Sequence, residues 1–411
     1  MEPCRLRLVI VSGLKEVVES QRRRNNAGLS WSYTLEEACS GFFAMQNLQR
    51  LLISYFAFWH PNCPMIHKPT FTVENSSPTL VAVMALVGAC AFGPASFSDD
   101  PLPYDPQDIT NPGLRDRLHA LQAAYCCILL QTLEGSAAAK RRARRSRYTD
   151  SLGAFRSVCS TAVTHGNLLS YLDHPDPDTV WRQFAMKEEL IRTLTYIVLL
   201  DAAWVILNNT PPRMALQEAR IPLASPEACF QAEDPHTWEG TMRVWTSSEN
   251  GLPQLTVEQV IRLMYKPQCL EQDWARLLRM SSLNLFTIIH PLHAQLFNVR
   301  CHPLPECQTL LQRQALDKWK LIHAQRTGIT ALPEVVPLDA NDWWKRTGFP
   351  QHALEYWSLA DLILTSCEPL PGFDQSANVN GSWASQLLSS YDESDMSQVH
   401  DLVSLFSGMN L

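Results

Sequence analysis

A long apolar run between Trp181 and Leu207 is the feature that most constrains the fold of this 411-residue chain. Its length and its content of leucine, isoleucine and alanine predict a helix in the interior of the protein. Three charged side chains interrupt it: Glu188, Arg192 and Asp201. Because a buried charge is costly unless a cation or amide groups compensate it, each of these three residues needs a partner elsewhere in the fold.

The spacing of the charges indicates what kind of site they form. Glu188 and Arg192 are four residues apart, so they can pair on one face of the helix. Asp201 follows nine residues later, among leucines and alanines. We interpret the three residues as a structural polar network that fixes helix register, in preference to a ligand site.

The rest of the chain also carries helix signals. Apolar residues recur at helical spacing in many segments, and sustained alternation of apolar and polar residues is absent. We therefore predict an all-α fold, an irregular domain of roughly ten or more helices without a substantial sheet. The longest other apolar stretch, Leu80 to Phe92, is short for a bilayer that needs ~20 residues, and no membrane association is predicted.

Several helix boundaries can be placed from local signals. Thr34 and Glu37 have the spacing of a capping box and predict a helix start. Ser77-Pro78 and Asn111-Pro112 each combine an N-cap residue with a first-turn proline. Apolar spacing predicts single helical runs over residues 35–56 and 274–292, and the segment from Asn208 to Pro226 is expected to be a loop.

The cysteines do not form a metal-binding pattern. The chain has 12 cysteines but no Cys-x-x-Cys, the spacing with which short loops wrap a tetrahedral zinc ion. One cluster of histidines and cysteines is a candidate for metal binding: His290, His293, Cys301, His302 and Cys307. Ordinary core and surface positions account for it better than a metal site, so neither metal nor cofactor is predicted, and the thiols are expected to be reduced.

Catalytic motifs are not found either. A helical enzyme acting on a diphosphate would need two acidic magnesium-binding motifs, and Ser98-Asp99-Asp100-Pro101 and Asn341-Asp342-Trp343-Trp344 each lack the further acids. Glycine-rich phosphate loops and nucleophile elbows are also missing from the sequence. We predict that the chain is not an enzyme, and the alternative is an all-α ligand-binding protein or enzyme.

One short segment of the chain, residues 140–147, is strongly basic. It holds six cations in eight residues: Lys140, Arg141, Arg142, Arg144, Arg145 and Arg147. Such a run repels itself and stays exposed, so nuclear import receptors could read it or it could contact phosphates. A merely solvated segment is the other reading, and Arg22-Arg23-Arg24 is a weaker copy.

The last residues have the opposite charge. No Lys or Arg follows Arg346, whereas residues 347–411 contain eight acids: Glu355, Asp361, Glu368, Asp374, Asp392, Glu393, Asp395 and Asp401. Mixtures of acidic and hydrophobic residues can act as transcriptional activation segments. The helical spacing of Met396, Val399, Leu402, Val403 and Phe406 is also consistent with a short amphipathic helix packed on the core.

The order of several segments resembles the fungal-specific transcription factor domain, the regulatory domain that normally follows a zinc-based DNA-binding module. The likeness spans about residues 40–406 and rests on these segments: Tyr55 to Phe71, Leu80 to Ala91, Trp181 to Asp201, Asn208 to Trp238 and Gly348 to Trp357. The first ends in Pro-x-Ile-His-x-Pro-Thr-Phe. The cysteines of the chain do not have the spacing of such a zinc module.

The resemblance implies an organisation and a role. It implies an N-terminal extension over residues 1–33, the regulatory domain over 34–368 and the acidic tail over 369–411. Proteins of this kind are nuclear and often control a metabolic or secondary-metabolite gene cluster. We therefore expect a regulator that works through transcription machinery or co-regulators, as a homodimer or a heterodimer with a zinc-type factor, and whose contact with DNA is indirect.

Overall fold

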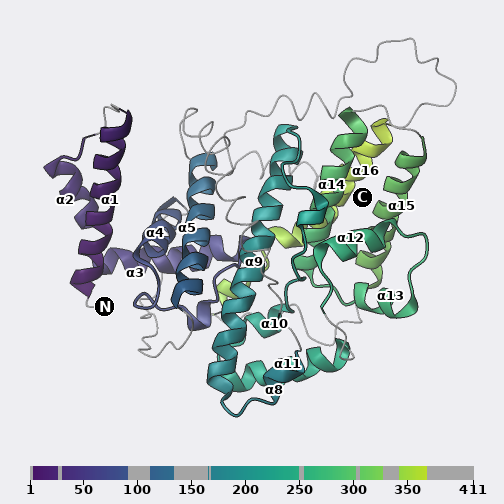
Figure 1. Ribbon diagram of the computed structural model, residues 1–411, viewed down its shortest axis with the longest axis horizontal. Coiled ribbons are helices and arrows are strands. Elements are labelled where there is room, and N and C mark those ends of the chain that lie inside the picture. Colours follow the sequence, from purple (N-terminus) through teal and green to yellow (C-terminus); the bar gives the residue numbers. More distant parts are fainter. Residues whose placement is uncertain are drawn as a thin grey trace, which may run out of the picture. The chain divides into compact units, whose positions relative to one another are not determined.

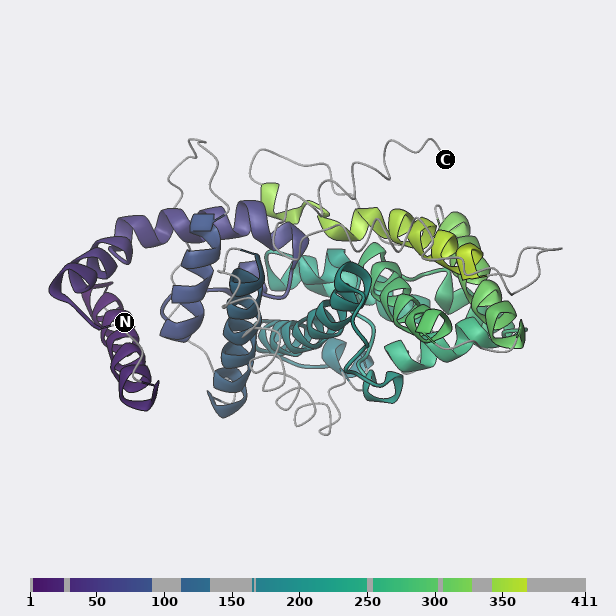
Figure 2. The ribbon, with the colours of Figure 1, turned by 90° about the horizontal axis from the view of Figure 1, so that it is seen from above.

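The computed structural model describes residues 3–25, 30–90, 112–133, 165, 168–249, 254–301, 306–326 and 342–367. All regular elements in these ranges are helices, and their one β-type contact is an isolated bridge between Pro222 and Thr256 (Figures 1 and 2). The predicted all-α fold is therefore confirmed over these residues. The chain divides into two compact units, residues 1–130 with 338–346 (unit 1) and residues 131–337 with 347–411 (unit 2). The predicted boundaries at 34 and 369 stay predictions.

Unit 1 contains most of its helices in the first third of the chain. They are α1 (Pro3–Asn25), α2 (Tyr33–Phe42), α3 (Met45–Ser54), η1 (Tyr55–Trp59), η2 (His60–Asn62), η3 (Lys68–Thr70), α4 (Pro78–Cys90), most of α5 (Pro112–Leu133) and η6 (Trp343–Lys345). The start of α4 is as predicted, because the Ser77 hydroxyl accepts the N–H of Leu80 at 3.2 Å. Pro78 lies in the first turn, where its missing N–H leaves no hydrogen bond unmade.

The predicted capping box at Thr34 and Glu37 is wrong. The N-cap of α2 is Ser32, whose hydroxyl accepts the N–H of Leu35 at 3.1 Å. Ser32 has the extended backbone that an N-cap needs (φ −113°, ψ 160°), whereas Thr34 already lies inside the first turn. Two hydroxyl residues so close together offer two possible starts, and the local sequence does not choose between them.

Two runs predicted as single helices are each divided. The run over 35–56 is shared between α2 and α3, and the run over 274–292 between α13 (Glu271–Leu277) and α14 (Ser282–Cys301). A short connection can leave the apolar spacing of two helices almost unchanged. Periodicity alone therefore does not reveal such a break.

The end of α3 widens into the π-helical turn η1. The ring of Phe56 packs edge-on against the rings of His60 and Phe71, each with a centroid distance of 5.3 Å. These contacts fold the chain sharply after η2. The aromatic segment from residue 55 to 71 is thereby placed in the core of unit 1.

The helices α3 and α4 lie very close to each other at Gly88. A Cβ atom on Gly88 would lie 2.0 Å from the carbonyl oxygen of Leu51 and 3.1 Å from the amide nitrogen of Tyr55. Both neighbours are backbone atoms, which do not rotate away as a side chain would. Glycine is thus required for the crossing of these two helices.

A segment from late in the chain completes unit 1. The turn η6 belongs to this unit although the residues before and after it belong to unit 2. Trp344 is 3% exposed, and its ring centroid lies 6.1 Å from that of His60. The Lys68 ammonium lies 5.1 Å from the Trp344 ring centroid, in reach of a cation–π interaction.

Unit 2 is built around α9. Its elements are α8 (Leu169–Leu172), α9 (Pro177–Asn208), η5 (Leu216–Glu218), α10 (Glu227–Phe230), α11 (Pro235–Glu249), α12 (Val257–Tyr265), α13, α14, α15 (Glu306–Gln325), η7 (Phe349–His352) and α16 (Ala353–Cys367). α14 packs along α9, and α8 and α11 gather around its N-terminal half (Figure 1). Length and hydropathy alone would let α9 cross a membrane, but 89% of its apolar window is buried inside the protein. Packing in the protein core therefore accounts for its composition.

Candidate functional site

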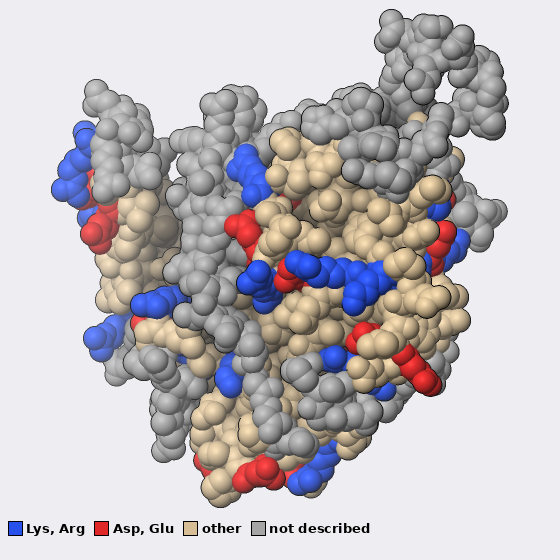
Figure 3. All heavy atoms as spheres, turned by 45° about the vertical axis from the view of Figure 1, so that its right-hand side comes forward, with Lys and Arg blue, Asp and Glu red and all other residues tan. Residues whose placement is uncertain are grey.

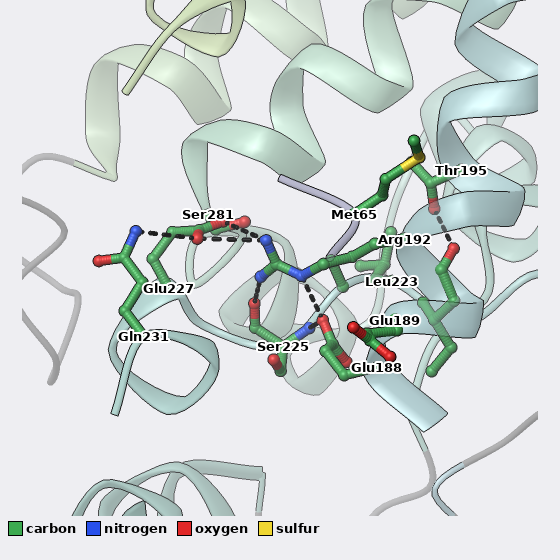
Figure 4. A network of polar contacts seen from close by, with 12 residues as sticks. Met65, Glu188, Glu189, Arg192, Thr195, Leu223, Ser225, Glu227, Gln231 and Ser281 are labelled. Atoms are coloured by element: carbon green, nitrogen blue, oxygen red, sulfur yellow. Dashed lines mark hydrogen bonds and ion pairs between the residues drawn. The ribbon is translucent and has the colours of Figure 1, made fainter. Parts of the chain in front are cut away.

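The charged side chains of α9 meet partners in the interior of unit 2 (Figure 4). Glu188 and Arg192 are each 0% exposed. The Nε atom of Arg192 donates a hydrogen bond to Oε1 of Glu188 at 2.8 Å. An exposed pair with this spacing contributes little to stability, but a buried pair is costly to break because the remaining charge has no water around it.

The second oxygen of Glu188 binds a histidine from the segment before α9. His165 Nε2 lies 2.9 Å from Glu188 Oε2, and because an ionised carboxylate can only accept, Nε2 carries the proton. His165 Nδ1 lies 3.2 Å from the hydroxyl of Tyr171. The imidazole also stacks on Phe184 with a centroid distance of 4.8 Å. His165 is therefore held from three sides.

The guanidinium of Arg192 has further contacts in unit 2 besides Glu188. Its Nη1 atom lies 3.1 Å from Oε1 of Glu227, and its Nη2 atom donates to the carbonyl oxygen of Ser225 at 3.2 Å. Its Cζ atom lies 3.8 Å from the centroid of the Phe230 ring. The planar fork of arginine suits this combination of a carboxylate, a carbonyl and an aromatic face.

The network keeps Glu188 ionised despite its burial. Burial raises the pKa of the Glu188 carboxyl, but the hydrogen bond from His165 and the charge of Arg192 outweigh it and hold the pKa at about 2. Burial likewise acts to lower the pKa of Arg192, and the carboxylates of Glu227 and Glu188 reverse this and raise it. The interior of unit 2 thus contains a charged group of matched partners.

The same ion pair satisfies the backbone of a distant segment. The N–H of Ser225 donates to Glu188 Oε1 at 2.9 Å, while its carbonyl accepts from Arg192. The neighbouring Ala224 is held in the same way by Asn284 of α14, whose side-chain oxygen and nitrogen bind the N–H and the carbonyl at 2.9 Å each. The backbone pairing of residues 221–223 with residues 255–257 ends before these two positions, and side chains supply the hydrogen bonds of Ala224 and Ser225.

Asp201 has a different partner set from Glu188 and Arg192. Its carboxylate accepts the backbone N–H groups of Arg213 and Met214 at 3.1 and 3.0 Å. The chain leaves α9 at Asn209, which has a positive φ of 50°, and then returns along the helix. Residues 213–214 meet Asp201 and residue 225 meets Glu188 and Arg192, so all three charges hold the one returning segment over residues 209–226.

The side chains of this network are too deeply buried to contact a substrate. The chain of Glu188, His165 and Tyr171 has the groups of a carboxylate-oriented base, but the three residues are 0%, 3% and 7% exposed. Among the described residues, no group of three or more His, Cys, Asp and Glu side chains is placed to hold a metal ion. The observed geometry supports a structural role, in which the charges fix the returning segment on α9.

The two histidines of the candidate His/Cys cluster are occupied inside the core. His290 Nδ1 lies 2.7 Å from the carbonyl oxygen of Phe286, and His293 Nε2 lies 2.8 Å from that of Tyr356. Burial lowers the pKa of His290 to about 3 and that of His293 to about 4. Both are therefore neutral core residues, and His290 bonds within α14 whereas His293 joins α14 to α16. The side chains of residues 301, 302 and 307 lie outside the described residues.

Sequence reasoning missed the partners of the network. His165, Ser225, Glu227 and Asn284 lie between 23 and 60 residues from the groups that they contact. No spacing rule connects them to α9. The available signal was indirect, since a carboxylate and a guanidinium in an apolar helix require partners without identifying them. The basic run over residues 140–147 and the acidic tail over 369–411 lie outside the described residues.

Comparisons with known proteins give a consistent result. A model of the family described as "Fungal specific transcription factor domain" matches residues 52–320. A curated protein from Penicillium polonicum, transcription factor verF, is 32% identical over 429 aligned residues, covering 95% of this chain. The chain spans 57% of the length of that relative. No solved structure matches the chain.

Proposed function

This chain belongs to the fungal-specific transcription factor domain family, and on that premise we propose that it is the regulatory domain of a fungal transcription regulator, one that works through protein partners. The observation that carries the proposal is the family match over residues 52–320, which includes all of α9 and its returning segment. The relative that aligns with 95% of this chain is itself named a transcription factor.

We propose that contact with DNA is indirect for this chain. The sequence has no paired-cysteine zinc pattern, and reading of bases requires side chains presented in a groove beside a basic surface. On the face shown in Figure 3, the Lys and Arg side chains form a band across the middle and several smaller groups, and acidic side chains lie beside most of them. In unit 2, Arg220 and Arg262 both pair with Glu258. The proposed partners are transcription machinery, co-regulators and a second copy or a zinc-type factor that supplies the DNA contact.

We further propose that the regulated genes form a metabolic or secondary-metabolite cluster. This rests on the family alone. The chain itself is proposed to have no catalytic role, since the one carboxylate–histidine chain described above is closed to substrates by burial.

Nuclear import is expected to depend on the basic run. Deleting residues 140–147 removes six cations and should abolish nuclear accumulation of a fluorescently tagged chain, because import receptors recognise clustered Lys and Arg. The matched control replaces Arg22, Arg23 and Arg24 by glutamine, which should leave the nuclear signal intact. An undiminished nuclear signal after the deletion would refute the assignment of this run.

The regulatory role is tested by tethering. The chain is fused to an unrelated DNA-binding domain, and a reporter gene is read with and without residues 369–411. Truncation there removes the acidic tail but retains α16, which ends at Cys367. We expect the reporter to respond to the fusion and to lose activation when the tail is removed. A folded, nuclear fusion that leaves the reporter unchanged would contradict the proposed function.

A further inference from the structure

The ammonium group of Lys318 on α15 lies against the end of α12, which packs beside α15 (Figure 1). Its Nζ atom donates to the carbonyl oxygen of Leu263 at 3.0 Å and also to that of Lys266. A third contact joins Nζ to the Sγ atom of Cys269 at 3.7 Å. Because a lysine ammonium has three N–H donors, the two carbonyls and the sulfur use all of them. The fold thus holds an amine and a thiol in contact although they are 49 residues apart in the chain.

The thiol of Cys269 has a defined orientation. Its Sγ atom donates to the carbonyl oxygen of Leu263 at 3.6 Å, so the S–H hydrogen points to that oxygen and a sulfur lone pair faces the Lys318 ammonium. Cys269 and Lys318 are both half-buried, while residues 266–268 and 270 beside the thiol are exposed. A reagent as small as hydrogen peroxide therefore has access to the sulfur.

Burial protects several other thiols from oxidation. Cys63, Cys126 and Cys229 are 2%, 0% and 0% exposed. Burial raises the pKa of Cys63 and of Cys126, and it raises the pKa of Cys229 to about 12. The thiolate is the form that attacks an oxidant, so these three thiols stay unreactive. Cys39 of α2 is half-buried, and burial raises its pKa too. The contact with Lys318 distinguishes Cys269 from these four cysteines.

The contact between sulfur and ammonium permits a two-step reaction. In the first step the sulfur attacks one oxygen of hydrogen peroxide, the O–O bond breaks, and the thiol becomes a sulfenic acid while one water leaves. In the second step the Lys318 ammonium gives a proton to the sulfenic hydroxyl, and the resulting amine attacks the sulfur. The S–O bond breaks, an S–N bond forms, a second water leaves and one proton passes to solvent. Condensation of a sulfenic acid with an adjacent nitrogen is known chemistry of oxidised cysteine.

We propose that Cys269 and Lys318 are a covalent modification site, at which hydrogen peroxide drives formation of an S–N cross-link between α15 and the segment after α12. The cross-linked nitrogen retains one N–H in place of three, so the carbonyls of Leu263 and Lys266 lose hydrogen bonds that cap the end of α12. Oxidation therefore replaces a set of hydrogen bonds by one covalent bond. The inference does not rest on the transcriptional role, because a cross-link is measured on the purified chain.

The first test treats the purified full chain with hydrogen peroxide, digests it with trypsin in the absence of reductant and analyses the peptides by mass spectrometry. We expect a linked pair of peptides joined at Cys269 and Lys318, whose mass is the sum of the two peptides less two hydrogen atoms. Dithiothreitol should separate the pair, since thiols reduce the S–N bond. A wild-type chain in which Cys269 is oxidised without a linked pair, or is not modified at all, would overturn the proposal.

Variants separate the cross-link from oxidation of the thiol alone. Lys318→Arg keeps a cation beside the sulfur, but arginine does not lose its proton and so does not attack. It should abolish the linked pair, while dimedone, which reacts with sulfenic acids, still labels Cys269. Cys269→Ser should abolish both signals, and the matched control Cys39→Ser should leave the amount of linked pair unchanged. A linked pair that survives Lys318→Arg would place the bond elsewhere and refute the assignment. Circular dichroism checks that each variant is folded, and the wild-type result decides without them.

Discussion

Arg192→Leu is expected to lower the free energy of unfolding by about 3–5 kcal/mol, the cost of leaving a buried partner charge uncompensated. The substitution removes the hydrogen bond to Glu188 and the contacts to Glu227 and the Ser225 carbonyl. Because most domains are stable by only about 5–15 kcal/mol, the expected loss is a large fraction of the total stability. Denaturant unfolding of the full chain, followed by circular dichroism, measures it.

A pair on the same helix provides the control. Arg182 and Asp178 have the same four-residue spacing and an N–O distance of 2.9 Å, but their side chains are 19% and 52% exposed. Arg182→Leu should therefore cost less than about 1 kcal/mol. The double variant Glu188→Leu/Arg192→Leu should cost less than the two single variants together, since it removes both charges of the fully buried pair and only the partly exposed Glu227 loses its contact to Arg192. If Arg192→Leu were as mild as Arg182→Leu, the network would not stabilise unit 2.

The same network makes stability depend on pH. The pKa of Glu188 falls from its ordinary 4.5 to about 2 in the folded chain. A depressed pKa stabilises the fold above the ordinary value, and this contribution is lost as the pH falls through the folded value. It amounts to roughly 3 kcal/mol between pH 4.5 and pH 2. The double leucine variant should lack this part of the acid sensitivity.

Gly88→Ala is the second substitution with a large expected effect. Its methyl carbon would lie 2.0 Å from the Leu51 carbonyl oxygen, so α4 and α3 must move apart. Overpacking of this kind costs about 1–3 kcal/mol, and the upper part of that range is expected because the obstructing atoms are backbone. Thermal unfolding of the full chain measures the loss.

Gly240→Ala in α11 is the matched control. A Cβ on Gly240 meets nothing within 4 Å. Alanine favours the helix over glycine by up to about 1 kcal/mol, so this variant should be neutral or more stable than the wild type. Equal effects of the two substitutions would show that α3 and α4 do not depend on their close crossing.

The sequence predicted the helices well because local signals specify them. Ser77 and Pro78 determine the start of α4, and the apolar composition of α9 leaves few alternatives to a buried helix. The errors were also local. Ser32 rather than Thr34 caps α2, and short breaks divide runs that looked continuous. The π-helical turn η1 has no sequence signal of its own.

The candidate site could be predicted only in part. The spacing of Glu188 and Arg192 indicated a pair, and the burial of Asp201 required a cation or amides as its partner. Which of these it would be depends on Asn209, where the chain reverses and brings the amides of residues 213 and 214 to the carboxylate. A return over that length is a tertiary feature, and no local rule encodes its register.

The position of η6 late in the chain limits how the coding sequence can be divided between the two units. Because unit 1 takes Trp344 from a segment flanked on both sides by unit 2, the chain passes between the units three times, near residues 130, 337 and 346. No single cut in the coding sequence yields either unit whole. Recombination at one breakpoint would leave unit 1 without the indole that Lys68 and His60 contact, so the two units should be inherited, duplicated and lost together.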